Sequence, residues 1–106
     1  MNKVILVGRI CRDIETEEVG KGKNAVTKVW NCIACQKTKD DADFINFTAL
    51  GKTAEILDEY ANKGDKILIE GHIDVYTSED KKGNKTTYTS VIADRIELLG
   101  GKKNSD

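Results

Sequence analysis

Apolar and polar residues alternate with a period of two along most of this chain, which is typical of β-strands with one buried face. In residues 44–50, Ile45 and Phe47 fall on one face and Phe44 and Asn46 on the other. The pattern and the turn residues between its segments predict strands at residues 3–9, 25–36, 44–50, 67–76 and 86–98. Residues 3–9 are apolar on both faces, which favours a strand that is covered on both sides or paired at a subunit contact.

One helix interrupts the strand pattern. Residues 53–61 carry apolar side chains at spacings of three and four, which predicts a helix of about three turns with one apolar stripe. Thr53 can cap its first turn, and Gly64 lies where a helix C-cap glycine belongs. The segments at residues 11–18, 20–24, 38–42 and 78–85 are predicted to be polar connections, with Gly83–Asn84 as a hairpin turn.

The few aromatic residues are predicted to divide between the core and the surface. Phe47 is predicted to point into the core, and Tyr60 to lie on the apolar stripe of the helix. The position of Tyr88 stays open, because the register of the last strand is uncertain by one residue. Flat side chains on an outer strand face are suited to stacking on the bases of a single-stranded nucleic acid. The residues expected on strand faces opposite the aliphatic positions are Trp30, Phe44, Tyr76, Leu50 and Asn46.

The charge of the chain is balanced overall but unevenly distributed. With 17 basic and 18 acidic residues the formal net charge is −1, which does not by itself indicate a nucleic-acid-binding protein. Between Lys21 and Lys39, however, there are five lysines and no acid, so one basic groove is compatible with a neutral total. The main candidate phosphate contacts are Arg9, Lys28, Lys37 and Lys52, and the weaker candidates are Lys39 and Lys85.

No catalytic or cofactor motif is present in the sequence. A nucleophile motif, a phosphate-binding loop and a dinucleotide fingerprint are all missing, so we expect neither an enzyme nor a cofactor. Cys32 and Cys35 form a CxxC, but side chains three apart on a strand point to opposite faces and cannot share a metal. We therefore expect no metal site and predict that the cysteines pack as small apolar groups.

Several short motifs occur in an order that resembles one family, the bacterial and bacteriophage single-stranded DNA-binding proteins. The opening at residues 2–9 and the last hairpin are similar to those of the family, so the resemblance covers almost the whole chain. The central motifs are Phe44, Gly51-Lys52, Ala54-Glu55, Tyr60, Lys63-Gly64 and Ile69-Glu70-Gly71.

The resemblance implies the OB-fold, a five-stranded Greek-key barrel, and the strand and helix pattern fits this all-β class with one short helix. It also implies sequence-tolerant coating of exposed single-stranded DNA in replication, recombination or repair. A homo-oligomer is expected, a tetramer in the family, built partly through the first strand.

Some residues depart from the pattern of that family. Tyr76 lies two residues before the usual aromatic position, which is Ser78 here; Leu50 replaces a frequent aromatic residue, and Asp74 a frequent basic one. These departures predict weaker or shorter-range binding. The chain carries no acidic, hydrophobic tip in its last residues, so we do not expect partners to be recruited through a tail.

The length predicts a single domain at residues 1–100 with a short polar tail at 101–106. No apolar run approaches the roughly 20 residues of a membrane span, and no signal peptide is evident, so we expect a cytoplasmic protein without a membrane partner. Three alternatives remain at this point: an OB-fold accessory module that binds mainly other proteins, an RNA-binding OB domain, and a redox or metal function of the cysteines.

Overall fold

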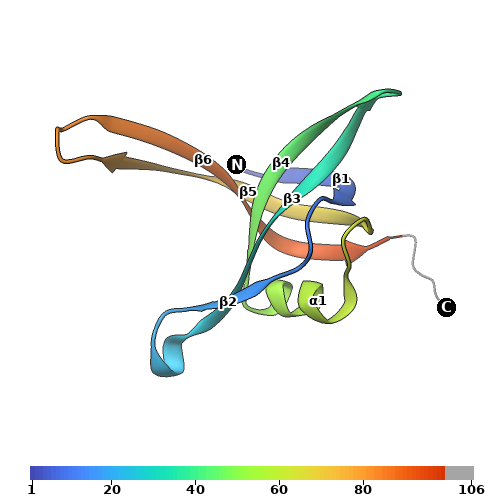
Figure 1. Cartoon of the computed structure of the whole chain (residues 1–106), viewed down its shortest axis with the longest axis horizontal. Helices are drawn as coiled ribbons and strands as arrows, with labels where there is room; N and C mark the ends of the chain where they lie inside the picture. Colours follow the sequence, from blue (N-terminus) through green and yellow to red (C-terminus); the bar gives the residue numbers. More distant parts are fainter. Residues whose placement is uncertain (100–106) are drawn as a thin grey trace.

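The computed structural model describes residues 1–99, so the predicted tail at residues 101–106 lies outside the described residues. Figure 1 shows long curved strands with a short helix below them in this view. No helix among the described residues has the length and apolarity needed to cross a bilayer. The elements are β1 (Val4–Ile10), β2 (Thr16–Val19), a 3₁₀ turn η1 (Gly22–Asn24), β3 (Val26–Thr38), β4 (Asp41–Leu50), α1 (Lys52–Tyr60), β5 (Lys66–Glu79) and β6 (Lys85–Leu98).

Five of the strands form a closed ring. The hydrogen-bonded order is β1-β5-β6-β4-β3-β2, and β1 pairs in addition with β3. All pairs are antiparallel except β4 with β6, which is parallel. The predicted all-β barrel with one short helix is therefore confirmed.

The prediction of a polar excursion at residues 11–18 was incomplete, because the structure has a sixth strand, β2, in this region. It lies outside the ring and pairs with β3 from Thr16↔Val29 to Val19↔Val26. The hydroxyl of Thr27 donates a hydrogen bond of 2.9 Å to Oε2 of Glu18. This strand has three polar residues out of four, so it gave no apolar alternation from which it could be recognised.

Two glycines allow strands to approach closely where the ring bends. A Cβ atom on Gly8 would lie 2.2 Å from the carbonyl oxygen of Ala34, at the place where β1 meets β3. A Cβ atom on Gly71 would lie 2.0 Å from the carbonyl oxygen of Ile92, beside a shift of register between β5 and β6. Any side chain at these positions would push the backbones apart.

The core fills the ring with the side chains that the alternation pointed inward. Phe47 is completely buried, as predicted. The helix α1 packs against β3, β4 and β6 and buries Ala54 and Leu57. The other large side chains with no exposed surface are Val29, Asn31, Ile33, Ile67 and Ile69.

The predicted ends of the helix were wrong. Its N-cap is Gly51, with φ of 60°, and the Thr53 hydroxyl donates instead to the carbonyl oxygen of Leu50 at 2.9 Å. The helix ends at Tyr60 and is followed by extended backbone at Ala61. Gly64, with φ of 92°, belongs to a separate turn at residues 62–65.

Tyr60 was also predicted wrongly, because it is 62% exposed and does not pack in the core. The buried face of the helix is narrow and consists of Ala54 and Leu57. Tyr60 follows Leu57 by three residues and is thus rotated by about 60° from it around the helix axis. On a helix that ends at this residue, the rotation directs the ring into solvent.

We predict that Phe47→Ala lowers the free energy of unfolding by about 3–5 kcal/mol, because it leaves a cavity in a closed core. Phe44→Ala, three residues away on the same strand, is the matched control, and we expect a change of no more than about 0.5 kcal/mol for this exposed side chain. Urea denaturation of both variants measures the difference. Similar losses in the two variants would contradict the assignment of the inner and outer faces of β4.

Candidate nucleic-acid interface

The pairing of β3 with β4 places two aromatic side chains on one outer face. Trp30 lies opposite Thr48, and Phe44 lies opposite Ala34, so the two are offset by an even number of positions along each strand. Trp30 is 54% exposed and Phe44 is 72% exposed. They are four positions apart along the ribbon, or about 14 Å at the rise of a β-strand. Both predicted outward positions are confirmed.

Three further predicted residues share this face. Lys28 is directly opposite Leu50, next to Trp30 along β3, and Leu50 is 42% exposed. Asn46 lies opposite Cys32, between the two aromatic residues. We refer to Lys28, Trp30, Phe44, Asn46 and Leu50 together as the outer β3–β4 surface.

The sequence analysis missed Arg12, which the structure adds to this surface. Its guanidinium carbon lies 4.3 Å from the centroid of the Trp30 ring, a cation–π arrangement. Its Nη2 atom also donates a hydrogen bond of 3.1 Å to Oδ1 of Asn46. Arg12 is the single cation between Cys11 and Gly20. That isolated positive charge among four acids was the available signal in the sequence.

Asn31 is the buried polar residue of the core, and it anchors the segment that carries Arg12. Its Oδ1 atom accepts hydrogen bonds from the backbone N–H of Arg12 at 3.2 Å and of Cys32 at 2.7 Å. Its Nδ2 atom donates to the carbonyl oxygens of Arg12 at 3.1 Å and Asp13 at 3.4 Å. A buried amide group is stable only with such partners, and here they fix the loop after β1 against β3.

Tyr76 belongs to a different surface. It lies on the β5–β6 hairpin, which leaves the barrel in another direction than the β3–β4 hairpin (Figure 1). Its ring stacks on that of Tyr88, opposite in register, with centroids 5.2 Å apart. The structure therefore joins Tyr76 to Tyr88, and it does not join Tyr76 to Trp30.

The hairpin extends beyond the core. Ile73 and Val75, which the alternation placed on the buried face, are 38% and 59% exposed. These two residues do lie on the same face of the strand as the core residues, but at this height no other strand of the described chain packs over that face. An open hollow of about 430 Å³ connects the base of the hairpin, at Ile73 and Thr89, with Phe44 and Asn46 on β4.

The tip of this hairpin is held by one carboxylate. Oδ1 of Asp80 accepts hydrogen bonds of 2.9 Å from the backbone N–H groups of Lys82 and Asn84. The side-chain amide of Asn84 donates to Oδ2 at 3.2 Å. These bonds, chiefly the one from the backbone of Asn84, lower the pKa of Asp80 below its ordinary value. The predicted turn at Gly83–Asn84 thus depends on an ionised Asp80.

The predicted cations are distributed over several places. Lys28 alone belongs to the outer β3–β4 surface. Lys37 pairs with Asp43 at 3.8 Å, one residue from Phe44. The Nη1 atom of Arg9 donates at 3.0 Å to the carbonyl oxygen of Gly64, and Lys52 is the exposed first residue of α1. Lys39 and Lys85 lie at the turn ends of the two hairpins.

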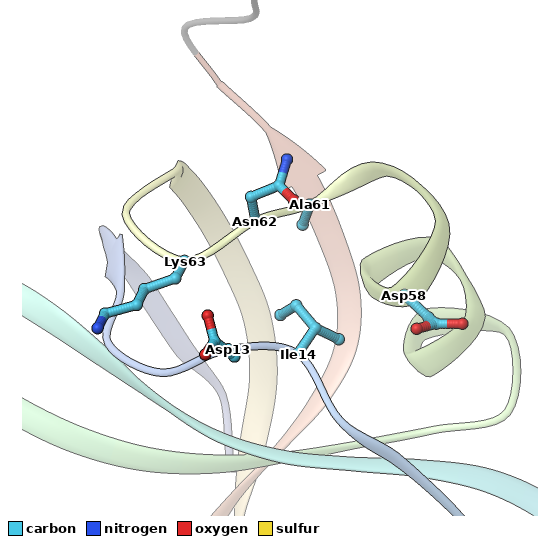
Figure 2. Close-up of a pocket in the computed structure, with 6 residues that line it drawn as sticks. All are labelled: Asp13, Ile14, Asp58, Ala61, Asn62 and Lys63. Atoms are coloured by element: carbon cyan, nitrogen blue, oxygen red, sulfur yellow. The ribbon is translucent and has the colours of Figure 1, made fainter.

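Two hollows lie next to this surface, and each is lined by acidic and basic side chains together. One, of about 390 Å³, is lined by Cys11, Arg12, Asp13, Glu15, Trp30 and Lys63. The other, of about 360 Å³, lies between the loop after β1 and the end of α1; Figure 2 shows Asp13 and Ile14 on one side and Asn62 and Lys63 on the other, with Asp58 on the helix. In both hollows the carboxylates share the lining with Lys63, and in the first also with Arg12, so neither lining carries a large charge of one sign.

In the structure the neighbour of Cys32 is Cys11, and not Cys35 of the CxxC motif. Sγ of Cys11 lies 2.7 Å from Sγ of Cys32, and neither of them nor Cys35 is in a disulfide. Burial, together with the hydrogen bond to Cys32, raises the pKa of Cys11 to about 11, and burial also raises that of Cys35. Protonated thiols are weak nucleophiles and metal ligands. Within residues 1–99, no three His, Cys, Asp or Glu side chains gather closely enough to hold a metal ion.

Comparison with known proteins gives a consistent set of relatives. A model of the single-strand binding protein family matches residues 1–99. A single-stranded DNA-binding protein of Fusobacterium nucleatum is 42% identical, over 99% of this chain and 71% of that protein. Proteins of the same name from Wolinella succinogenes and Clostridium perfringens are 36% and 32% identical, over 95% and 93% of this chain. The chain spans 65% and 66% of the length of these last two.

We predict that the tip of the β5–β6 hairpin loosens in acid at a pH below the ordinary range for an aspartate. A lowered pKa means that the ionised carboxylate stabilises the fold at higher pH, and that this contribution is lost as the pH falls through the pKa of the folded state. The amide NMR signals of Lys82 and Asn84 should report this transition. The variant Asp80→Asn should lack it, and an unchanged transition in that variant would contradict the assignment.

Proposed function

Because the chain belongs to the single-strand binding protein family, we propose that it binds single-stranded DNA without reading the base sequence. The observation that carries this proposal is the outer β3–β4 surface, where Trp30 and Phe44 are exposed on one face of one ribbon. Leaving two large aromatic rings in water on a small domain is unfavourable unless they have a partner. Bases that stack on these rings would remove them from water.

The geometry is suited to a flexible strand rather than a duplex. The two rings are separated by about 14 Å along the ribbon, so two bases that are not adjacent on an extended strand can stack one on each ring. Base–aromatic stacking contributes about 1–3 kcal/mol per base and tolerates any base. Asn46 and Leu50 complete the path with polar and apolar contacts.

Several basic side chains would contact the phosphates of the bound strand. Lys28 lies within the outer β3–β4 surface, and Lys52 follows Leu50 after one glycine. Lys37 would exchange its ion pair with Asp43 for a phosphate, at little cost because that pair is exposed. Arg9 is a weaker candidate than these lysines, since its guanidinium group already donates a hydrogen bond to a carbonyl oxygen. Tyr76, with Tyr88, offers a second stacking position on the β5–β6 hairpin.

This function requires binding alone. The protein would coat exposed strands in the cytoplasm during replication, recombination or repair, without chemistry or a cofactor of its own. The closeness of Asp13, Glu15 and Asp43 to the binding path agrees with weaker binding than a fully basic groove would give.

A homo-oligomer is the second part of the proposal. On the outer face of β1, Ile5 is 62% exposed and Val7 is 41% exposed, whereas Leu6 between them packs against the core. An apolar outer face on a strand of the barrel is well suited to pairing with a second copy of the chain. The relation to the family favours a tetramer.

We predict that oligo(dT) quenches the fluorescence of Trp30 at low salt and that added salt reverses the effect, because phosphate contacts release counterions. Phe44→Ala should weaken binding by about 1–3 kcal/mol, the loss of one stacked base. Tyr60→Ala removes another exposed aromatic ring, from α1, and serves as the control. Absence of quenching at low salt would contradict the function, and comparable binding of matched RNA would contradict the preference for DNA.

We predict a mass in solution of about four times 11.7 kDa, measured by light scattering with and without a thymidine oligomer. Ile5→Asp should lower this mass, because it buries a charge in the contact. Val75→Asp places the same charge on the exposed hairpin and should leave the mass unchanged. A monomeric wild-type protein would refute the contact through β1.

A further inference from the structure

Arg12 occupies one of the two faces of Trp30 on which a base could stack. Its guanidinium carbon is 4.3 Å from the centroid of the Trp30 ring, so one face of that ring is covered in the free protein. A base can stack on this face of the ring only if the guanidinium group leaves it. The one tryptophan of the outer β3–β4 surface is thus partly occupied from within the chain.

The backbone of Arg12 is fixed, whereas its side chain is held loosely. Fully buried Asn31 makes hydrogen bonds to both the N–H and the C=O of Arg12. The guanidinium group has only exposed contacts, namely the ring of Trp30 and one hydrogen bond to Asn46. Exposed contacts of this kind are weak. The side chain can therefore move while its attachment point stays in place.

The charge of Arg12 is available for a phosphate. Within residues 1–99, Arg95 pairs with Glu70 and Glu97 and Lys37 pairs with Asp43, but Arg12 forms no ion pair. Asp13 and Glu15 line the same hollow without pairing with it. Arginine is also the side chain whose planar group binds a phosphate through two parallel hydrogen bonds.

We propose that Arg12 is a strand-contacting residue that exchanges Trp30 for a phosphate when a base stacks on the tryptophan, and that Asn31 is the residue that positions it. The proposal rests on the proposed function, since the incoming ligand is single-stranded DNA. The exchange replaces one planar partner of Trp30 by another. It leaves the cation beside the backbone of the strand that displaced it.

The first test needs no DNA. Acrylamide is a neutral quencher of tryptophan fluorescence, and Arg12→Gln should make Trp30 more accessible to it, with a steeper Stern–Volmer plot than in the wild-type protein. Arg12→Lys, which keeps the charge but not the planar group, should give an intermediate slope. Equal slopes in all three proteins would show that Arg12 does not cover the ring and would overturn the proposal.

The second test uses oligo(dT) at several salt concentrations. Arg12→Gln should reduce the slope of log K against log salt by about 0.7, the value for one phosphate contact with a single strand. Arg12→Lys should keep the slope of the wild-type protein. An unchanged slope in Arg12→Gln with binding retained would overturn the role of Arg12 and leave the proposed function standing. Failure of the wild-type protein to bind would refute the proposed function itself.

The role of Asn31 is tested by a double variant. Asn31→Asp keeps the acceptor for the N–H of Arg12 and removes the donor to its carbonyl oxygen, so it is the variant of choice if Asn31→Ala does not fold. Either variant should increase the acrylamide quenching of Trp30, and adding Arg12→Gln should then cause no further increase. Fully additive increases would show that Asn31 acts on Trp30 independently of Arg12, which would refute its positioning role.

Discussion

The antiparallel pairing of β3 with β4 is the interaction on which both the barrel and its outer surface depend. The ladder runs from Lys28↔Leu50 to Cys35↔Asp43 without a shift of register. On its inner side it buries Val29 and Phe47, and on its outer side it exposes Trp30. A slip of one residue would exchange these two sets. The burial of Phe47 therefore fixes the exposure of the aromatic rings on the same ribbon.

Closure of the ring adds a second constraint, which acts on the backbone. Where β1 crosses to β3, the absence of a side chain at Gly8 lets the two strands touch. The chain that leaves this crossing carries Arg12, and its peptide groups must find partners in a crowded region. Asn31 supplies them from inside the barrel. One polar residue in an apolar core thus connects the closure of the fold with the arrangement of its surface.

The electrostatic properties follow from placement rather than from total charge. The formal net charge is −1, yet the acids Asp13, Glu15 and Asp58 collect around two hollows beside the loop after β1. Lys28 lies on the ribbon itself, and the side chain of Arg12 reaches the ribbon from the loop after β1. A nearly neutral domain can therefore place positive charges beside the aromatic rings, although acids lie close to them.

The sequence by itself determined the local features, namely the five strands of the ring, the single helix and the inner or outer direction of Trp30, Phe44 and Phe47. These follow from a period of two residues, which each strand carries independently of its neighbours. The tertiary structure decided which apolar positions are exposed nevertheless, as Val75 and Tyr60 are. Their exposure depends on how far the neighbouring strands and the helix extend. It alone also placed Arg12 over Trp30, Cys11 beside Cys32 and Tyr76 on Tyr88. Contacts between residues distant in sequence depend on which strands become neighbours, and no local pattern records that.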